Sequence, residues 1–110
     1  MSYTVTILTL FPDMFPGPLG ASITGRGLKE GHWTLDVMDI RDFATDKHKT
    51  VDDTPYGGGA GMVMKADVVA KAIEAARQNN PNAPVVFLTP GGVPFAQTHA
   101  KGFAAEKGLI

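Results

Sequence analysis

The part of this chain best suited to chemistry is a glycine-rich segment preceded by acidic residues. Four of the five positions from 57 to 61 are glycine, and the residues before them include Asp52, Asp53, Pro55 and Tyr56. Glycine lets backbone amides come close to a ligand and adopt positive φ angles. A surface connector is the simpler interpretation of glycine alone, but flexible linkers lack carboxylates, proline and aromatic rings. The composition therefore favours a binding loop.

The known phosphate-binding glycine loops do not match this segment. No Lys-Ser or Lys-Thr pair follows the glycines, as the P-loop of nucleotide triphosphatases requires. The spacing of Gly57, Gly59 and Met62 lacks the third glycine of the dinucleotide fingerprint, and no expected strand directly precedes it. ATP and NAD are therefore poor candidates for the ligand.

A second candidate segment is the turn from Thr89 to Gly92, which follows an apolar run at 85–88. Open parallel sheets bind ligands beyond the carboxyl ends of their strands. Backbone groups of such a turn can pair with a ligand while Phe87 and Leu88 supply apolar contact. An ordinary strand-to-helix turn is the alternative that these residues leave open.

Hydrophobic periodicity predicts the elements that must position both segments. We expect strands at 3–10, 33–38 and 85–88 and helices at 21–30, 68–77 and 94–107. The continuous apolar run at 85–88 predicts a strand covered on both faces, and residues 41–64 show no periodicity. Strands alternating with helices predict an α/β domain with a largely parallel sheet flanked by helices.

Proline and glycine mark the expected ends of the helices. Gly31 is expected to end the first helix and Gly108 the third, while Pro94 is expected in the first turn of the third. Leu109 and Ile110 resemble the start of a further strand, which suggests that the chain is truncated.

Composition narrows the class of protein. The chain has 110 residues, a net charge of -1 and no cysteine, so disulfides and thiolate metal sites are excluded. If RNA is the substrate, either a local basic patch or another part of the protein binds it. No apolar stretch approaches the ~20 residues that cross a bilayer, and no basic region precedes the first apolar residues. The histidines lack ligand spacing, so no metal is expected. The cytoplasm is the expected compartment.

Five motifs in order give the chain a specific resemblance to a known family. They are Phe11-Pro12-Asp13-Met14-Phe15, Thr24-Gly25-Arg26, Arg41-Asp42-Phe43, His48-Lys49-Thr50-Val51-Asp52-Asp53 and Pro55-Tyr56-Gly57-Gly58-Gly59-Ala60-Gly61-Met62. Together with the turn at 88–92, this series resembles the bacterial tRNA (guanine-N1)-methyltransferases of the knotted SPOUT superfamily. Helix breakers at 16–18 and a second glycine at 92 depart from the family pattern.

The resemblance implies methyl transfer from S-adenosylmethionine to N1 of the guanine at position 37 of tRNA, beside the anticodon. It also implies a homodimer whose active site lies at the subunit interface. Residues 1–110 would form the N-terminal part of a SPOUT trefoil-knot methyltransferase domain. The catalytic base of the family lies in a later segment, so we expect the catalytic residues beyond Ile110.

The resemblance also suggests roles for individual residues. Donor binding is expected from Phe87, Leu88, Thr89, Pro90 and Gly92. Guanine recognition is expected from Asp52, Gly57, Gly58, Gly59, Gly61 and Met62, because a carboxylate accepts hydrogen bonds from guanine and glycines let the base approach the backbone. Contacts with the tRNA backbone are expected from Arg26, Arg41, Lys47, His48 and Lys49, with a solvated charged surface as the alternative for each.

Two other classes of function remain open from the residues alone. The chain could be a noncatalytic α/β module that binds a nucleotide or an anion through the glycine segment. It could also be a dimerisation unit whose glycines permit close packing between chains.

Overall fold

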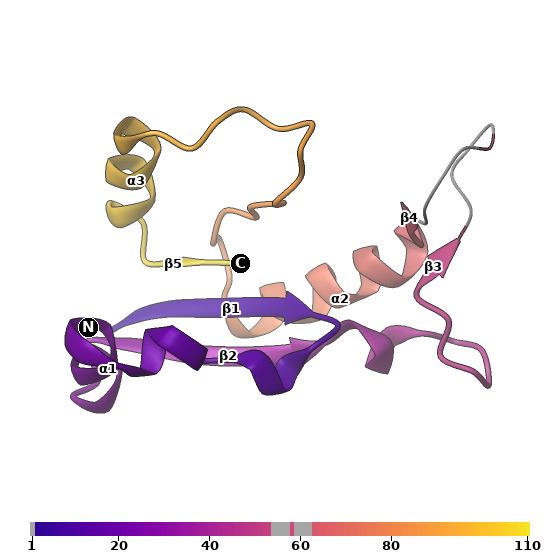
Figure 1. Cartoon of the computed structure of the whole chain (residues 1–110), viewed down its shortest axis with the longest axis horizontal. Helices are drawn as coiled ribbons and strands as arrows, with labels where there is room; N and C mark the ends of the chain where they lie inside the picture. The colour runs from indigo at the N-terminus through magenta and orange to yellow at the C-terminus, as the bar shows by residue number, and fades with distance from the viewer. Residues whose placement is uncertain (1, 54–57, 59–62) are drawn as a thin grey trace.

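A computed structural model describes residues 2–53, 58 and 63–110 of this chain. Its centre is a parallel sheet in the order β2-β1-β5, formed by β1 (Tyr3–Thr9), β2 (Trp33–Asp39) and β5 (Gly108–Leu109) (Figure 1). β1 pairs with β2 from Tyr3↔Trp33 to Thr9↔Asp39 and with β5 at Thr4↔Gly108 and Val5↔Leu109. The prediction of an α/β chain with a largely parallel sheet is confirmed.

The connection between β1 and β2 runs through two 3-10 turns and a short helix. The turns are η1 (Pro12–Met14) and η2 (Gly17–Gly20), and the helix is α1 (Ser22–Lys29). Gly31 has a φ of 81° and donates its backbone N–H to the Leu28 carbonyl at 3.2 Å. A residue with positive φ just after a helix is the common glycine C-terminal stop, so the predicted end of this helix is confirmed.

The longest helix, α2 (Ala66–Asn79), covers the predicted region and extends it at both ends. Val68, Ala72 and Ala76 are its buried residues, and their spacing of four places them on one face of the helix. Val68 packs in the core with Ile40, which opens the 3-10 turn η3 (Ile40–Phe43), and with Val51. The segment from 41 to 50 is therefore fixed to the core at both of its ends.

The stretch from 41 to 64, for which the sequence predicted no regular structure, contains a short antiparallel ladder. β3 (Asp52–Asp53) pairs with β4 (Val63–Met64), with Asp52 opposite Met64 and Asp53 opposite Val63. Strands of two residues are too short to produce a periodic pattern, which is why the sequence did not reveal them.

The prediction of a strand at 85–88 that is covered on both faces is wrong. Val86 donates its N–H to the Ile110 carbonyl at 2.8 Å, and Ile110 donates to the Pro84 carbonyl at 3.0 Å. Those bonds flank Val85 in the manner of a parallel pair. Phe87 and Leu88, however, are 67% and 89% exposed. Among the described residues, nothing covers the side chains of Phe87 and Leu88.

The third helix begins later than predicted. α3 spans Gln97–Ala104, and Ala96, its N-cap, is extended with φ −130° and ψ 166°. Pro94 therefore lies before the helix. The Ala96 N–H donates to the Nδ1 of His99 at 2.9 Å, which caps the start of α3. Gly108 does not end this helix but belongs to β5.

Candidate functional site

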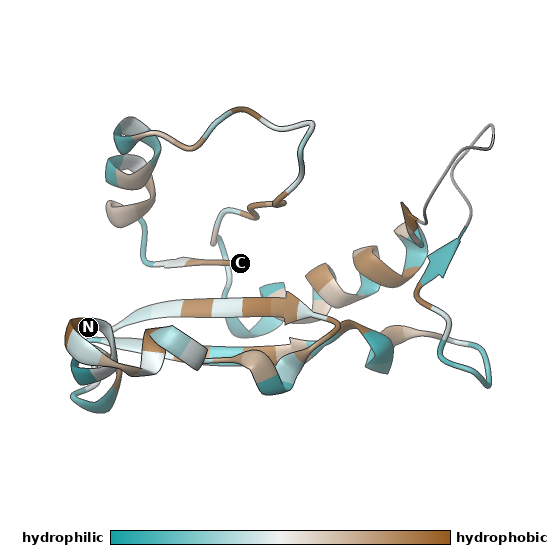
Figure 2. Ribbon diagram, in the orientation of Figure 1, coloured by the Kyte–Doolittle hydropathy of each residue, from teal (hydrophilic) through white to brown (hydrophobic). Residues whose placement is uncertain are grey.

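An apolar cavity of about 500 Å³ lies beside the central strand β1. Its walls come from β1 and the two residues after it, from α2, and from Ile40 and Met64. Residues 85–88 and 109–110 complete the lining. Figure 2 shows hydrophobic colouring on β1, on α2 and on the segment that leaves α2. Ligand pockets are typically concave, mostly apolar and of about 300–1,000 Å³, so this cavity has the volume of a small-molecule site, with Thr6 and Thr9 as the polar side chains of its lining.

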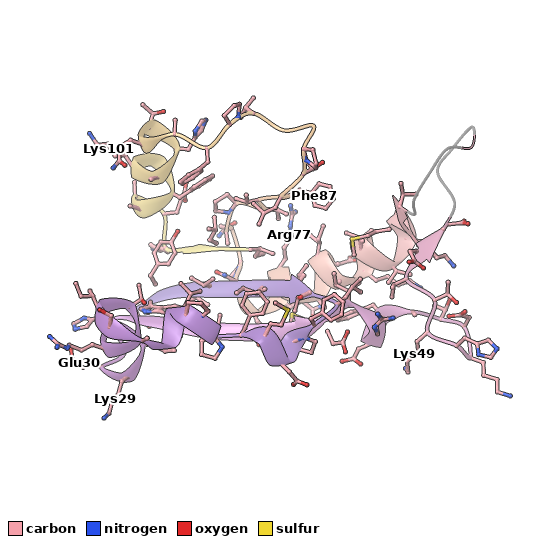
Figure 3. All side chains as sticks on the ribbon, in the orientation of Figure 1. Lys29, Glu30, Lys49, Arg77, Phe87 and Lys101 are labelled. Atoms are coloured by element: carbon pink, nitrogen blue, oxygen red, sulfur yellow. The ribbon has the colours of Figure 1, made fainter. Side chains whose placement is uncertain are left out.

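Two of the residues expected to bind the donor lie on the wall of this cavity. Phe87 and Leu88 both line it, and Figure 3 shows Phe87 on the segment that rises from the end of α2. Both side chains are exposed, in contrast to the predicted burial.

The turn that follows is closed by its own hydrogen bonds. Gly92 donates its backbone N–H to the Thr89 carbonyl at 3.1 Å, and Gly91 donates to the Thr89 hydroxyl at 3.3 Å. A Cβ at Gly92 would stand 3.4 Å from the Thr89 carbonyl oxygen, so a side chain there would press on the turn. Thr89, Pro90 and Gly92 therefore form a preformed, exposed turn directly after the cavity wall.

The acidic flank of the glycine segment reaches the same cavity through the short ladder. Met64 lines the cavity, and its partner across the β3–β4 ladder is Asp52. Residues directly opposite in an antiparallel pair have Cβ atoms about 5 Å apart, so Asp52 stands next to a residue of the cavity wall. Asp52 itself does not line the cavity, so its part in guanine recognition stays a prediction.

Among the glycines predicted for guanine recognition, Gly58 is the one that falls within the described residues. Its φ is 89°, and a Cβ built on it would meet nothing within 4 Å. The positive φ explains the need for glycine at this position. Gly57, Gly59, Gly61 and Met62 lie outside the described residues, and their part in guanine recognition stays a prediction.

Four of the five predicted backbone-contact cations come from one segment. Arg41, Lys47, His48 and Lys49 are exposed between the core residues Ile40 and Val51. The Asp39 carboxylate accepts the Arg41 N–H at 2.9 Å, and the Asp46 carboxylate accepts the N–H of Thr50 at 2.6 Å as well as its hydroxyl. These bonds shape a loop that presents three consecutive basic or titratable side chains to solvent.

Arg26 does not join this group. It lies in the last turn of α1, and Figure 3 places Lys29 of the same turn and Lys49 toward opposite ends of the longest axis, which measures 45 Å. A contact of Arg26 with RNA would therefore be separate from a contact made by the 41–49 segment.

Two titratable groups have shifted pKa values with clear causes. The pKa of Asp46 lies below its usual value, chiefly because the hydroxyl and then the N–H of Thr50 donate to the ionised carboxylate. The pKa of Tyr3 is raised by burial and then by the nearby Glu106. The Tyr3 hydroxyl donates to the Phe103 carbonyl in α3 at 2.8 Å, so it joins β1 to that helix.

The described part of the chain offers neither a metal cluster nor a membrane-spanning helix. It contains no group of three or more His, Cys, Asp or Glu residues that is placed to hold a metal ion. Among the same residues, no helix has the length and apolar character needed to span a bilayer.

Comparison with known proteins gives a consistent result. Residues 3–110 match the family described as tRNA (Guanine-1)-methyltransferase TrmD. A tRNA (guanine-N(1)-)-methyltransferase from Novosphingobium aromaticivorans is 56% identical over 110 residues, which is all of this chain and 45% of that protein. The protein of the same name from Rhizobium etli is 51% identical over 110 residues, or 47% of its length.

The fold gives the same family. The crystal structure of a tRNA (m1G37) methyltransferase from Aquifex aeolicus superposes with a TM-score of 0.86 at 25% identity, covering 99% of this chain and 49% of that one. The chain therefore spans about half the length of the relatives that it matches. With a family match from residue 3 to residue 110, this chain belongs to the tRNA (guanine-1)-methyltransferase family.

Proposed function

We propose that this chain supplies the donor wall and part of the guanine site of an enzyme that methylates N1 of the guanine at position 37 of tRNA. The observation that carries the proposal is the shared cavity, which Phe87 and Leu88 line on one side and Met64, the ladder partner of Asp52, lines on another. A methyl donor and an acceptor base must meet within van der Waals distance, and Met64 links the short ladder that contains Asp52 to the edge of this cavity.

The donor side suits S-adenosylmethionine. The apolar wall of Phe87 and Leu88 offers a surface for the adenine ring, and the backbone of the turn at Thr89, Pro90 and Gly92 offers hydrogen-bonding groups for its edge. When bound, this donor supplies an electrophilic methyl group on a sulfonium. The residues of the chain bind and orient it, and they exclude water from the apolar wall.

The acceptor side uses Asp52 together with the glycine segment. The Asp52 carboxylate accepts hydrogen bonds from a guanine edge, and the glycines at 57, 58, 59 and 61 with Met62 receive the flipped base. Neutral guanine is a weak nucleophile at N1, so a base must remove that proton. We assign this base to a segment outside the 110 residues.

The exposed cations at 41–49 contact the phosphates of the tRNA, and Arg26 makes a separate contact at the other end of the chain. Phosphate contacts position RNA without reading its sequence. In the same proposal, residues 1–110 are the N-terminal part of a SPOUT trefoil-knot domain. The protein acts in the cytoplasm as a homodimer with its active site at the subunit interface.

A methyl-transfer assay tests the proposal in the longest natural polypeptide that contains this chain. Radiolabelled S-adenosylmethionine should label a tRNA with guanine at position 37 and leave a tRNA with adenine there unlabelled. Asp52→Asn should lower kcat/KM for tRNA by about tenfold, the effect of one hydrogen bond to a charged group. Asp53→Asn, which makes the same change at the neighbouring position, should have a smaller effect.

Tight binding of tRNA without any methyl transfer would contradict the proposed enzymatic activity and favour a noncatalytic binding module. Gly61→Leu separates the remaining alternative: lost activity with an intact dimer supports a substrate role, whereas a monomeric protein indicates that the glycines serve packing.

A further inference from the structure

Asn80 places a buried amide at the junction of α2, β1 and β5. The residue is the C-cap of α2 and is only 6% exposed. Its Nδ2 donates to the Thr4 carbonyl of β1 at 3.0 Å and to the Leu109 carbonyl of β5 at 3.1 Å, and it lies 3.4 Å from the Thr6 hydroxyl. An amide NH₂ has two protons, so the two shorter bonds use both of them and link neighbouring strands.

The space for this amide is created by Gly108. A Cβ at position 108 would stand 2.5 Å from Asn80 Oδ1 and 2.5 Å from the Thr4 carbonyl oxygen. Gly108 is buried and pairs with Thr4. The sequence predicted that Gly108 ends a helix. In the structure, position 108 must be glycine because the side chain of Asn80, 28 positions earlier, occupies the space that a Cβ would take.

The strand that Asn80 holds is bonded on its other side to the donor segment. Ile110, directly after the Leu109 carbonyl, accepts from Val86 at 2.8 Å and donates to Pro84 at 3.0 Å. Phe87, on the cavity wall, is the next residue after Val86. A continuous series of hydrogen bonds thus runs from β1 through Asn80 and β5 to the segment that enters the donor turn.

An ordinary helix cap does not account for these contacts. Asparagine at a helix end commonly bonds to nearby backbone of its own turn, but the partners of Asn80 Nδ2 are 76, 74 and 29 residues away in sequence. The backbone N–H of Asn80 makes the capping bond, to the Ala76 carbonyl.

We propose that Asn80, together with Gly108, is a positioning residue for the donor site: it fixes β5 against β1 and thereby sets where the 84–88 segment stands. The inference rests on the proposed function, because it assigns the donor to the wall at Phe87 and Leu88. It names a residue that touches neither donor nor guanine and acts through β5.

The test compares Asn80→Ala with Asn79→Ala in the longest natural polypeptide that contains this chain. Asn79 is the exposed neighbour at the end of α2 and is the matched control. Asn80→Ala should raise the KM for S-adenosylmethionine by about tenfold, the size expected when two buried carbonyls lose their donor. The KM for tRNA and the kcat at saturating donor should change by less than about twofold, an effect too small to reflect a lost hydrogen bond.

A merely structural role gives a different pattern. If the variant only lowers the folded fraction, kcat falls while the KM for the donor is unchanged, and that result would overturn the proposal. Should Asn80→Ala fail to fold, Asn80→Ser, which keeps a shorter donor, replaces it with the same expected direction in the KM for the donor.

Amide hydrogen exchange separates this proposal from the proposed function. The amides of Val86 and Ile110 should exchange faster in Asn80→Ala than in Asn79→Ala, whether or not the protein transfers methyl groups. A wild-type protein without transfer activity would refute the proposed function. The exchange rates would still test whether Asn80 stabilises the hydrogen bonds at Val86 and Ile110. Unchanged exchange at both amides would refute that link.

Discussion

At the scale of single residues, the contacts that matter most join parts of the chain that are far apart in sequence. The Tyr3 hydroxyl reaches the carbonyl of Phe103, one hundred positions later. This bond ties the first residue of β1 to the last turn of α3, which the sequence places at the other end of the chain.

Tyr3→Phe should lower the free energy of unfolding by about 1 kcal/mol, the typical net contribution of one hydrogen bond. Because the pKa of Tyr3 is raised above the usual 10.0 in the folded protein, its contribution is present below that value and is lost as pH rises through the folded pKa. Urea unfolding at neutral and alkaline pH measures both effects. The difference between wild type and Tyr3→Phe should shrink above pH 10, and Thr98→Val, at an exposed hydroxyl in α3, should show no such difference.

Asp46 gives the opposite dependence on pH. Its pKa is lowered by the two bonds from Thr50, so the order that it gives to the loop is present above its unfolded value of 3.8 and is lost as pH falls through the lower folded value. We expect the Thr50 amide to be protected from hydrogen exchange at neutral pH and to lose that protection in strong acid. Asp46→Asn should remove the protection at every pH; protection that persists in Asp46→Asn would show that the carboxylate does not shape the loop.

At the scale of elements, a glycine after one helix and a glycine inside another have opposite effects on stability. Gly31 needs its φ of 81°, whereas Gly102 lies inside α3 with nothing within 4 Å of an added Cβ. Gly31→Ala should therefore destabilise the protein by about 1 kcal/mol, while Gly102→Ala should stabilise it by about 0.5–1 kcal/mol because alanine favours helix. Thermal unfolding of the two variants measures the pair, and a shift of the same sign in both would contradict this account.

Strong periodic patterns were enough to predict β1, β2 and α2, because each has one face that must be buried. The burial of 85–88 and the start of α3 could not be obtained in this way. The sequence shows that Phe87 and Leu88 are apolar. Their burial depends on which elements pack against them, and local sequence does not specify that. Position 96 is extended because a histidine three residues later holds its amide, which no propensity scale records.

The candidate site shows the same division. Composition and family resemblance predicted roles for Asp52, Phe87 and Leu88; the structure places Phe87 and Leu88 on the cavity wall and Asp52 opposite Met64, which also lines it. Met64 and Asn80 drew no attention, because their importance depends on pairing across the β3–β4 ladder and on the packing of three elements. An asparagine followed by proline looks like any other helix breaker.

At the scale of the whole molecule, Lys47 and Lys49 lie together in one exposed loop, although the net charge of the chain is only -1. Lys47→Glu combined with Lys49→Glu should weaken tRNA binding and reduce its salt dependence, with the slope of log affinity against log salt falling by about one unit per lost phosphate contact. Lys29→Glu combined with Lys101→Glu makes the same change of charge on α1 and α3 and serves as the control. Filter binding across a salt series measures the slopes. Equal slopes for the two double variants would show that only total charge matters.

The position of β1 between β2 and β5 also has a consequence for biosynthesis. A ribosome adds about 5–20 residues per second, so Gly108 is made on the order of 5–20 s after Thr9. During that interval β1 can pair with β2, but its other edge exposes unpaired amides and carbonyls of the kind that recruit foreign strands. The nascent polypeptide thus passes through a period of vulnerability that ends only when residues synthesised about a hundred positions later close the open edge.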